Sequence, residues 1–225
     1  MVTTPVHPEL LLMLLADARL PTSGHTQSGG LEPALLGGLD PGDLDGYCMT
    51  RLQTVTLTEA ATAVVCRSRG LAGRPTDDVE FAWAARTPSP ALRAASRTLG
   101  RAYRRVALRL WPDAEALAEL SMVMTPSRPR VLGLVAAATG LSGHAVARLV
   151  AYDDVQSVLA ASLKLLPGDP VDATARLLDL SPAIDAVVDR VAGLTEPEDI
   201  PAWSAPLLEA WAESHAIAER RLFRA

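Results

Sequence analysis

Apolar residues recur along this chain mostly three and four positions apart, which is the spacing of one face of an α-helix. Glycine or proline stands at most junctions between these segments, where it ends a helix or shapes a turn. The alternating pattern of strands is missing, and its nearest candidate, Val55 between two threonines, lies inside a helical pattern. The spacing predicts helices near residues 8–18, 30–38, 43–69, 77–87, 89–111, 113–122, 128–140, 143–166, 171–180, 183–194 and 205–223.

Composition agrees with an all-α fold. The chain has 225 residues, of which 49% are hydrophobic but only 4% aromatic, as expected for helices packed through leucine, valine and alanine. We expect one all-helical domain spanning residues 1–225, a multi-helix bundle of about ten helices. The net charge of −5 gives no reason to expect nucleic acid or an anionic membrane as a partner. No segment reaches the roughly 18–20 apolar residues of a membrane span, so we expect a cytoplasmic protein.

The residues that usually carry chemistry are scattered. The histidines, among them His25 and His144, have no metal-binding spacing, and the glycines between Gly24 and Gly30 lack the lysine of a phosphate-binding loop. Cys48 and Cys66 lie about 27 Å apart on the predicted helix 43–69, too far to pair or to share one metal. The neighbours Asp153 and Asp154 would point about 100° apart on a helix, as solvated or packed polar groups rather than metal ligands. We therefore predict no catalytic residue, no metal site and no bound cofactor.

Three segments rise above this background, and the first is the N-terminal loop, residues 19–32 (RLPTSGHTQSGGLE). Proline fixes one backbone angle and glycine permits conformations that other residues avoid, so the segment encodes a shaped loop. Shaped loops between rigid helices often carry function. The candidate binding residues of this loop are Pro21, Gly24, His25, Ser28, Gly30 and Glu32.

The second segment is the predicted helix 89–111. Arginines at positions 93, 97, 101, 105 and 109 form a slanting stripe, and no acidic residue is interleaved to neutralise it. The stripe is either a solvated face or a docking site for an acidic protein surface; nucleic acid is disfavoured because aromatic stacking residues are lacking. Gly100 inside this helix costs roughly 1 kcal/mol relative to alanine, which indicates that something packs closely there. Arg97, Gly100 and Arg101 are candidate binding residues.

The third segment is the C-terminal end. Leu208, Trp211, His215, Ala218 and Leu222 recur at helical spacing, and the chain closes with RRLFRA. A histidine on an apolar stripe is a hydrogen-bonded core or interface residue more often than a ligand. Apolar residues between arginines are unusual at a chain end, so they either fold back onto the core or wait for a partner. The candidate binding residues are His215, Arg221, Leu222, Phe223 and Arg224.

Together the three segments resemble the UreF family, the urease accessory proteins F. The opening pattern L-P-x-G-x-x-x-x-S-x-G-L/I-E is matched in register except that Ser23 replaces its first glycine and His25 stands where many members have an aromatic residue. The block from Ser96 to Arg101 is similar to the family's S-R-x-x-G-R. The closing pattern is matched at Ser204, Pro206, His215, Arg221, Leu222, Phe223 and Arg224, with departures at Ala216, Glu219 and Arg220.

The resemblance implies a non-enzymatic helical scaffold that forms a homodimer. It further implies binding to urease accessory protein D, called H in some organisms, and to the nickel-carrying GTPase, accessory protein G. The assembly would pass nickel into apo-urease, with nickel in transit through the complex rather than bound as a cofactor. Two other classes stay open from the residues alone: a generic helical adaptor unrelated to nickel, and a helical enzyme that uses His25 or His144 with nearby carboxylates.

Overall fold

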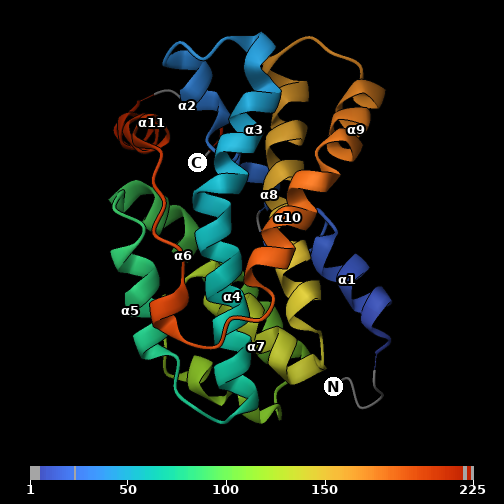
Figure 1. Ribbon diagram of the computed structural model, residues 1–225, viewed down its shortest axis with the longest axis vertical. Coiled ribbons are helices and arrows are strands. Elements are labelled where there is room, and N and C mark those ends of the chain that lie inside the picture. The colour runs from blue at the N-terminus through green and yellow to red at the C-terminus, as the bar shows by residue number, and fades with distance from the viewer. Residues whose placement is uncertain (1–5, 23, 220–221, 224–225) are drawn as a thin grey trace.

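The computed structural model describes residues 6–22, 24–219 and 222–223, with the side chain of His25 left out. Within these ranges the elements are all helical and no strand occurs, which confirms the all-α prediction (Figure 1). The α-helices are α1 (Pro8–Ala16), α2 (Leu31–Leu36), α3 (Leu44–Gln53), α4 (Val55–Leu71), α5 (Asp77–Ala85), α6 (Pro90–Leu110), α7 (Arg128–Thr139), α8 (Gly143–Leu165), α9 (Pro170–Asp179), α10 (Ser181–Val191) and α11 (Pro206–Ala216). Short 3₁₀ helices are η1 (Gly24–Thr26), η2 (Pro41–Asp43), η3 (Glu115–Ser121) and η4 (Pro197–Asp199).

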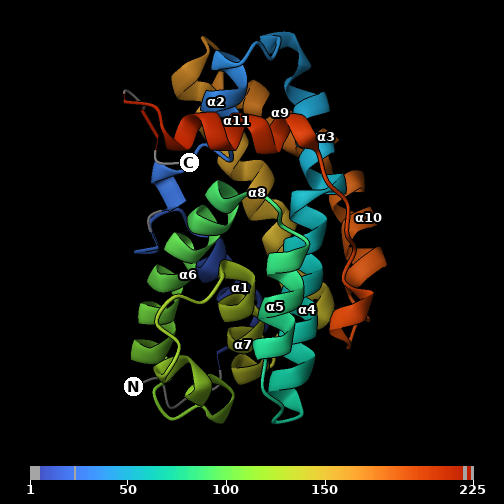
Figure 2. The same cartoon turned by 90° about the vertical axis from the view of Figure 1, so that its left-hand side faces the viewer.

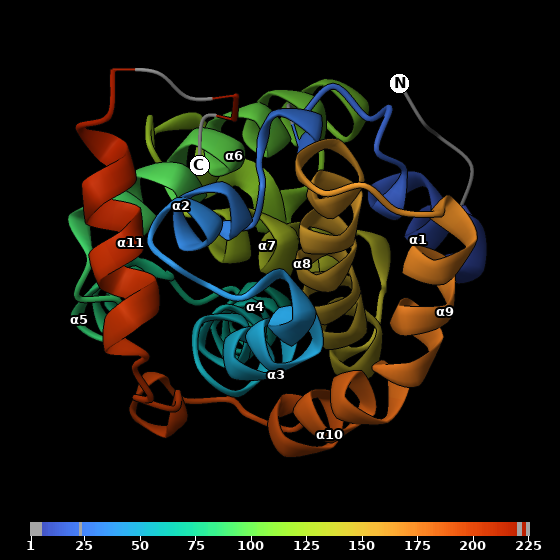
Figure 3. The ribbon, with the colours of Figure 1, turned by 90° about the horizontal axis from the view of Figure 1, so that it is seen from above.

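Helix α4 runs through the middle of the bundle and packs mainly against α7 and α8, whereas α6 lies on the far side of α7 (Figure 3). Its small residues Ala60, Ala61 and Ala63 are fully buried and allow its neighbours to approach closely. On the facing helix α7, a side chain at Gly133 would collide with the Ala63 carbonyl, so the two backbones touch there. The hydrophobic core extends outward from this contact as one cluster of buried residues. No helix in the described part of the chain is both long and apolar enough to cross a membrane.

The predicted helix 43–69 is wrong as a single element, because the chain breaks at Thr54 into α3 and α4. Thr54 has φ −125° and ψ −94°, far from helical values. The β-branched run from Thr54 to Thr56 favours the helix weakly. The break also serves a contact, since Arg51 before it and Thr56 after it both reach Asp154 on α8. Two buried polar partners are thereby brought to one carboxylate.

Two further helices differ from the prediction. Residues 115–121 form the 3₁₀ helix η3 instead of an α-helix. At the end of η3, the Arg104 guanidinium of α6 donates hydrogen bonds to the carbonyl oxygens of Leu120 and Ser121. The last helix ends at Ala216 instead of continuing to residue 223, because the chain turns back so that Phe223 is buried. The remaining helices begin and end within a few residues of the prediction.

The two cysteines lie on two helices rather than one, but both are free, as predicted. Burial raises the pKa of the Cys48 thiol to about 12, and burial raises that of Cys66 well above 9.0. Both thiols therefore stay protonated at neutral pH and serve as small apolar side chains of the core.

Candidate interaction site

The N-terminal loop and the C-terminal end meet at the carboxylate of Glu32. This side chain, in the first turn of α2, is 7% exposed and accepts hydrogen bonds from the backbone amides of Leu222 (2.6 Å) and Phe223 (2.8 Å). The His215 Nε2 atom lies 3.3 Å from the Phe223 carbonyl oxygen and 3.7 Å from the Glu32 carboxylate. We call Glu32, His215, Leu222 and Phe223 the tail clasp. Two segments that are almost the whole chain apart in sequence are joined by it.

Phe223 folds back onto the core, whereas Leu222 faces outward. Phe223 is 4% exposed and its ring lies 5.2 Å from the Lys164 Nζ atom, a distance suited to a cation–π contact. Leu222 is 65% exposed. The alternative in which both side chains wait for a partner is therefore wrong for Phe223 and stays open for Leu222. Arg221 and Arg224 lie outside the described residues.

The N-terminal loop is shaped by two glycines and a buried serine. Gly29 and Gly30 have φ values of 59° and 75°, which glycine adopts without strain, and the Tyr47 hydroxyl donates to the Gly29 carbonyl (2.9 Å). The fully buried Ser28 hydroxyl accepts the Glu32 amide (3.4 Å). These contacts set the direction in which Glu32 points toward the tail.

The other candidates of this loop lie before those glycines. Pro21 is exposed, and its carbonyl oxygen accepts from the Arg105 guanidinium (3.5 Å). Gly24 and the backbone of His25 belong to η1. No contact of Pro21 or Gly24 with the tail clasp is seen in the described residues, so the role of these three residues in binding stays a prediction.

Helix α11 lies across the ends of the neighbouring helices (Figure 2) and is held there by contacts of Trp211 and Glu213. Its Trp211 packs against Gly37, where any side chain would collide with the indole, and lies 6.4 Å from the Tyr47 ring. Its Glu213 carboxylate accepts from the Ser89 hydroxyl and from the Ala91 amide (2.9 Å) at the beginning of α6. A carboxylate at a helix N-terminus is favoured by the helix dipole.

A cavity of about 390 Å³ opens beneath α11, between α2, α6 and the start of α4. Gly30 of the N-terminal loop, Leu99 and Arg101 of α6, and His215 of α11 all contribute to its wall. The three segments that the sequence singled out therefore converge on one place in the fold. A mostly apolar cavity with a few convergent polar groups is the usual form of a binding site.

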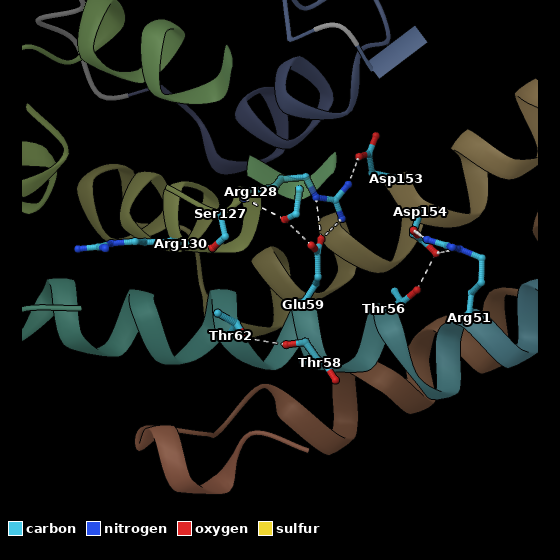
Figure 4. A network of polar contacts seen from close by, with 11 residues as sticks. Arg51, Thr56, Thr58, Glu59, Thr62, Ser127, Arg128, Arg130, Asp153 and Asp154 are labelled. Atoms are coloured by element: carbon cyan, nitrogen blue, oxygen red, sulfur yellow. Dashed lines mark hydrogen bonds and ion pairs between the residues drawn. The ribbon is translucent and has the colours of Figure 1, made fainter. Parts of the chain in front are cut away.

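Buried ion pairs form the polar side of this cavity (Figure 4). Asp154 on α8 accepts two hydrogen bonds from Arg51 (2.9 and 2.5 Å) and one from the Thr56 hydroxyl (2.6 Å). Burial alone would raise the pKa of Asp154, but the Arg51 charge and these hydrogen bonds outweigh it and hold the pKa below 3.8. The pair is thus fully charged at neutral pH.

A second pair lies beside the first. Arg128, at the start of α7, contacts Glu59 of α4 (3.0 Å) and Asp153 of α8 (2.7 Å), while the Ser96 hydroxyl of α6 donates to Glu59 (2.6 Å). Burial raises the pKa of Asp153, with Arg128 opposing the shift. Four helices are tied together at this cluster, so it fixes the walls of the cavity.

The arginine stripe of α6 divides into two parts. Arg97 pairs with Glu80 of α5 (3.8 Å) and its guanidinium lies 5.5 Å from the Trp83 ring centre. Arg101, Arg105 and Arg109 are exposed, and in the described ranges no carboxylate pairs with any of them. The arginines that can meet a partner are therefore Arg101, Arg105 and Arg109. Of the two predicted binding arginines, Arg101 is among them and Arg97 is not.

Gly100 is an internal contact point. A side chain there would collide with the Pro126 carbonyl and lie 2.8 Å from the Ser127 carbonyl carbon, so the close packing expected from the sequence is confirmed. Since Gly100 is buried by the segment that leads into α7, it can affect a partner only through the placement of α6.

We expect Gly100→Ala to lower the free energy of unfolding by about 1–3 kcal/mol, because the added methyl group meets backbone that cannot move aside. Urea unfolding monitored by circular dichroism measures this change in the free energy of unfolding. Gly168→Ala is the matched control, since no atom lies within 4 Å of a side chain added there. Equal stability of the two variants would mean that α6 and α7 can separate without cost.

Sequence reasoning missed the buried cluster around Arg51, Glu59, Arg128 and Asp154. It treated Asp154 only as a packed or solvated polar group, and it gave Arg51, Glu59 and Arg128 no role. A signal was present: Arg128 and Arg130 stand at the start of a helix that is otherwise largely apolar, where a buried charge requires a partner. The partners themselves could not be found, because Glu59 and Asp153 lie on two other helices.

The described residues contain no group of three or more His, Cys, Asp or Glu side chains arranged to hold a metal ion. His144 is exposed in the first turn of α8, and no carboxylate contact to it is seen in the described part of the chain. The geometry gives no support to an active site at His144.

Comparison with known proteins adds a family to this geometry. The UreF family model matches residues 39–181. A urease accessory protein UreF of Mycobacterium sp. (strain JLS) is 37% identical over 218 residues, covering 94% of this chain and 96% of the relative. Proteins of the same name from Mycolicibacterium vanbaalenii and Mycobacterium tuberculosis are each 35% identical, over 94% and 95% of this chain and 96% and 97% of the relatives.

Proposed function

The chain belongs to the UreF family, and on this basis we propose that it is a non-catalytic accessory protein of urease maturation that acts in the cytoplasm. Its role is to hold other accessory proteins in an assembly that delivers nickel to apo-urease. The observation that carries the proposal is the convergence of three separated segments around one cavity and the tail clasp. Packing of the core does not require these three segments to meet, so their meeting supports a role in binding.

Two partners follow from the family: urease accessory protein D or H, and the nickel-carrying GTPase, accessory protein G. The exposed arginines of α6 suit an acidic partner surface, because complementary charge speeds association and selects partners. The exposed Leu222, held in place by the tail clasp, suits a partner with an apolar pocket. Nickel is the cargo of the assembly, and a homodimer of this chain is its scaffold.

We expect Arg101→Glu with Arg105→Glu to leave the fold intact and to weaken binding to at least one of these partners by tenfold or more. Exposed arginines contribute typically less than 1 kcal/mol each to stability, whereas a reversed charge at a complementary interface costs several. Co-purification with accessory proteins D or H and G, followed by titration of binding, measures the effect. Urease from a host that carries the variant should contain less nickel.

The matched control is Arg74→Glu with Arg148→Glu, which reverses two exposed arginines away from α6, one in the loop after α4 and one on α8, each paired with one carboxylate. Normal binding by the α6 variant and by the control would show that the stripe is only solvated. Failure of the unmodified chain to bind any of the accessory proteins would contradict the proposed function itself.

A further inference from the structure

Helix α9 has two apolar faces, and only one of them is covered. Its residues Ala173 and Leu177 pack against the core, but no residue of the helix is fully buried. On the other side, Val171 is 70% exposed and Leu178 is 68% exposed, with Ala175 between them at helical spacing. A helix that is apolar on two sides is normally covered on both. The outer apolar stripe of α9, formed by Val171, Ala175 and Leu178, is therefore left exposed although its sequence is typical of a buried face.

The charge around this stripe is one-sided. Asp172 and Asp179 flank it, and neither forms an ion pair within the described ranges. Residues 166–200 contain eight acidic and two basic residues, a net charge of −6. Helix α6, by contrast, has six arginines and no acidic residue. Figures 1 and 3 place α6 on one side of α4 and α9 with α10 on others, so the molecule is electrically polarised.

The two basic residues of this acidic segment are already engaged. Arg176 pairs with Asp45 of α3 (2.7 Å), and the Arg190 guanidinium lies 5.5 Å from the Trp203 ring centre. Arg176 also attracts Asp172 electrostatically from the next turn of α9, whereas Asp179 forms no ion pair within the described residues. Any molecule that covers the outer face of α9 therefore meets leucine and valine in the middle and, along one edge, two aspartates of which only Asp172 is partly compensated.

We propose that the outer face of α9 is a docking surface for a cationic amphipathic helix of another protein. Such a helix would lay its apolar side on Val171, Ala175 and Leu178 and place lysine or arginine against Asp172 and Asp179. Helical anchors at spacings of three and four residues are the usual mode of this recognition. Nucleic acid and anionic membranes carry the same sign of charge as this face and are repelled. The contact goes beyond the proposed function, because it uses neither the cavity nor the tail clasp.

The test uses the full chain and a synthetic peptide of about 18 residues, long enough to form a helix, with leucine on one side and lysine on the other. The peptide should bind in low salt, as followed by fluorescence anisotropy. Val171→Ser with Leu178→Ser should weaken binding by on the order of tenfold or more. Asp172→Asn with Asp179→Asn should weaken it too and reduce its dependence on salt, because fewer charges are left to screen.

The matched control is Met122→Ser with Glu115→Gln, which makes the same kinds of change at an exposed methionine and glutamate near η3. It should bind like the unmodified chain, and a peptide with glutamate in place of lysine should not bind. The proposal is overturned by absence of binding, by equal loss in the control, or by unchanged binding in both α9 variants with intact helical spectra. Self-association in low salt that Arg101→Glu with Arg105→Glu abolishes would assign the face to a second copy instead.

Discussion

Asp154→Asn should lower the free energy of unfolding by about 3–5 kcal/mol, the cost of leaving a buried charge without its partner. The side chains of Arg51 and Asp154 are 8% and 10% exposed, so water cannot replace the lost contact. Asparagine has nearly the same shape, and the loss therefore reports the charge rather than a cavity. In a domain of this size the melting temperature should fall by roughly 10 °C.

Asp185→Asn is the control for this prediction. Asp185 pairs with Arg148 on the surface, where both side chains are more than half exposed, and such pairs contribute at most about 1 kcal/mol. Urea unfolding of the three proteins gives the comparison. If Asp154→Asn costs no more than Asp185→Asn, the cluster is hydrated and does not tie α3 to α8.

The same pair predicts how stability depends on pH. Burial raises the pKa of Asp154, but Arg51 and the hydrogen bonds lower it more, so the folded value lies below the unfolded value of about 3.9. A carboxylate of this kind contributes stability above the unfolded pKa and loses it as pH falls through the folded pKa. The difference in stability between the unmodified chain and Asp154→Asn should therefore shrink below about pH 4. The raised pKa of Asp153 acts in the opposite sense and largely cancels in this difference.

The helices could be predicted from the sequence because each one carries its own periodic pattern and its own ends. Thr54 shows where that reasoning fails. The helical pattern continues across Thr54. The break is explained by the hydrogen bonds that Arg51 and Thr56, on either side of it, both donate to the Asp154 carboxylate. Local preference is weak at a run of β-branched residues, so a contact from another helix decides the outcome.

The candidate site was predictable in its parts but not in its assembly. Glu32 and Phe223 were both identified as binding residues, yet nothing in a single sequence indicates that the carboxylate of one accepts the amide of the other. The cavity likewise exists only because α11 lies over it. The position of α11 is set by the packing of Trp211 against Gly37, a contact between segments far apart in sequence. The stripe of α6 was found by its spacing, and the structure was needed to show which arginines face outward.

The tail clasp yields the second large effect. Phe223→Ala should lower the free energy of unfolding by about 2–3 kcal/mol, the contribution of a large apolar side chain that is almost fully buried. Glu32→Ala should cost a similar amount, because two charge-assisted hydrogen bonds of the tail are lost together. The double variant should cost less than the two single effects added, since each change alone already releases the same segment.

Leu222→Ala is the variant that separates folding from binding. Because Leu222 is 65% exposed, its loss should change stability by no more than about 0.5 kcal/mol. If the clasp exists to present this side chain, the same variant should bind accessory protein D or H at least tenfold more weakly, although it melts normally. Melting and binding measured on one preparation decide between the roles. Unchanged binding by Leu222→Ala, together with a large melting shift in Phe223→Ala, would show that the C-terminal end only closes the fold.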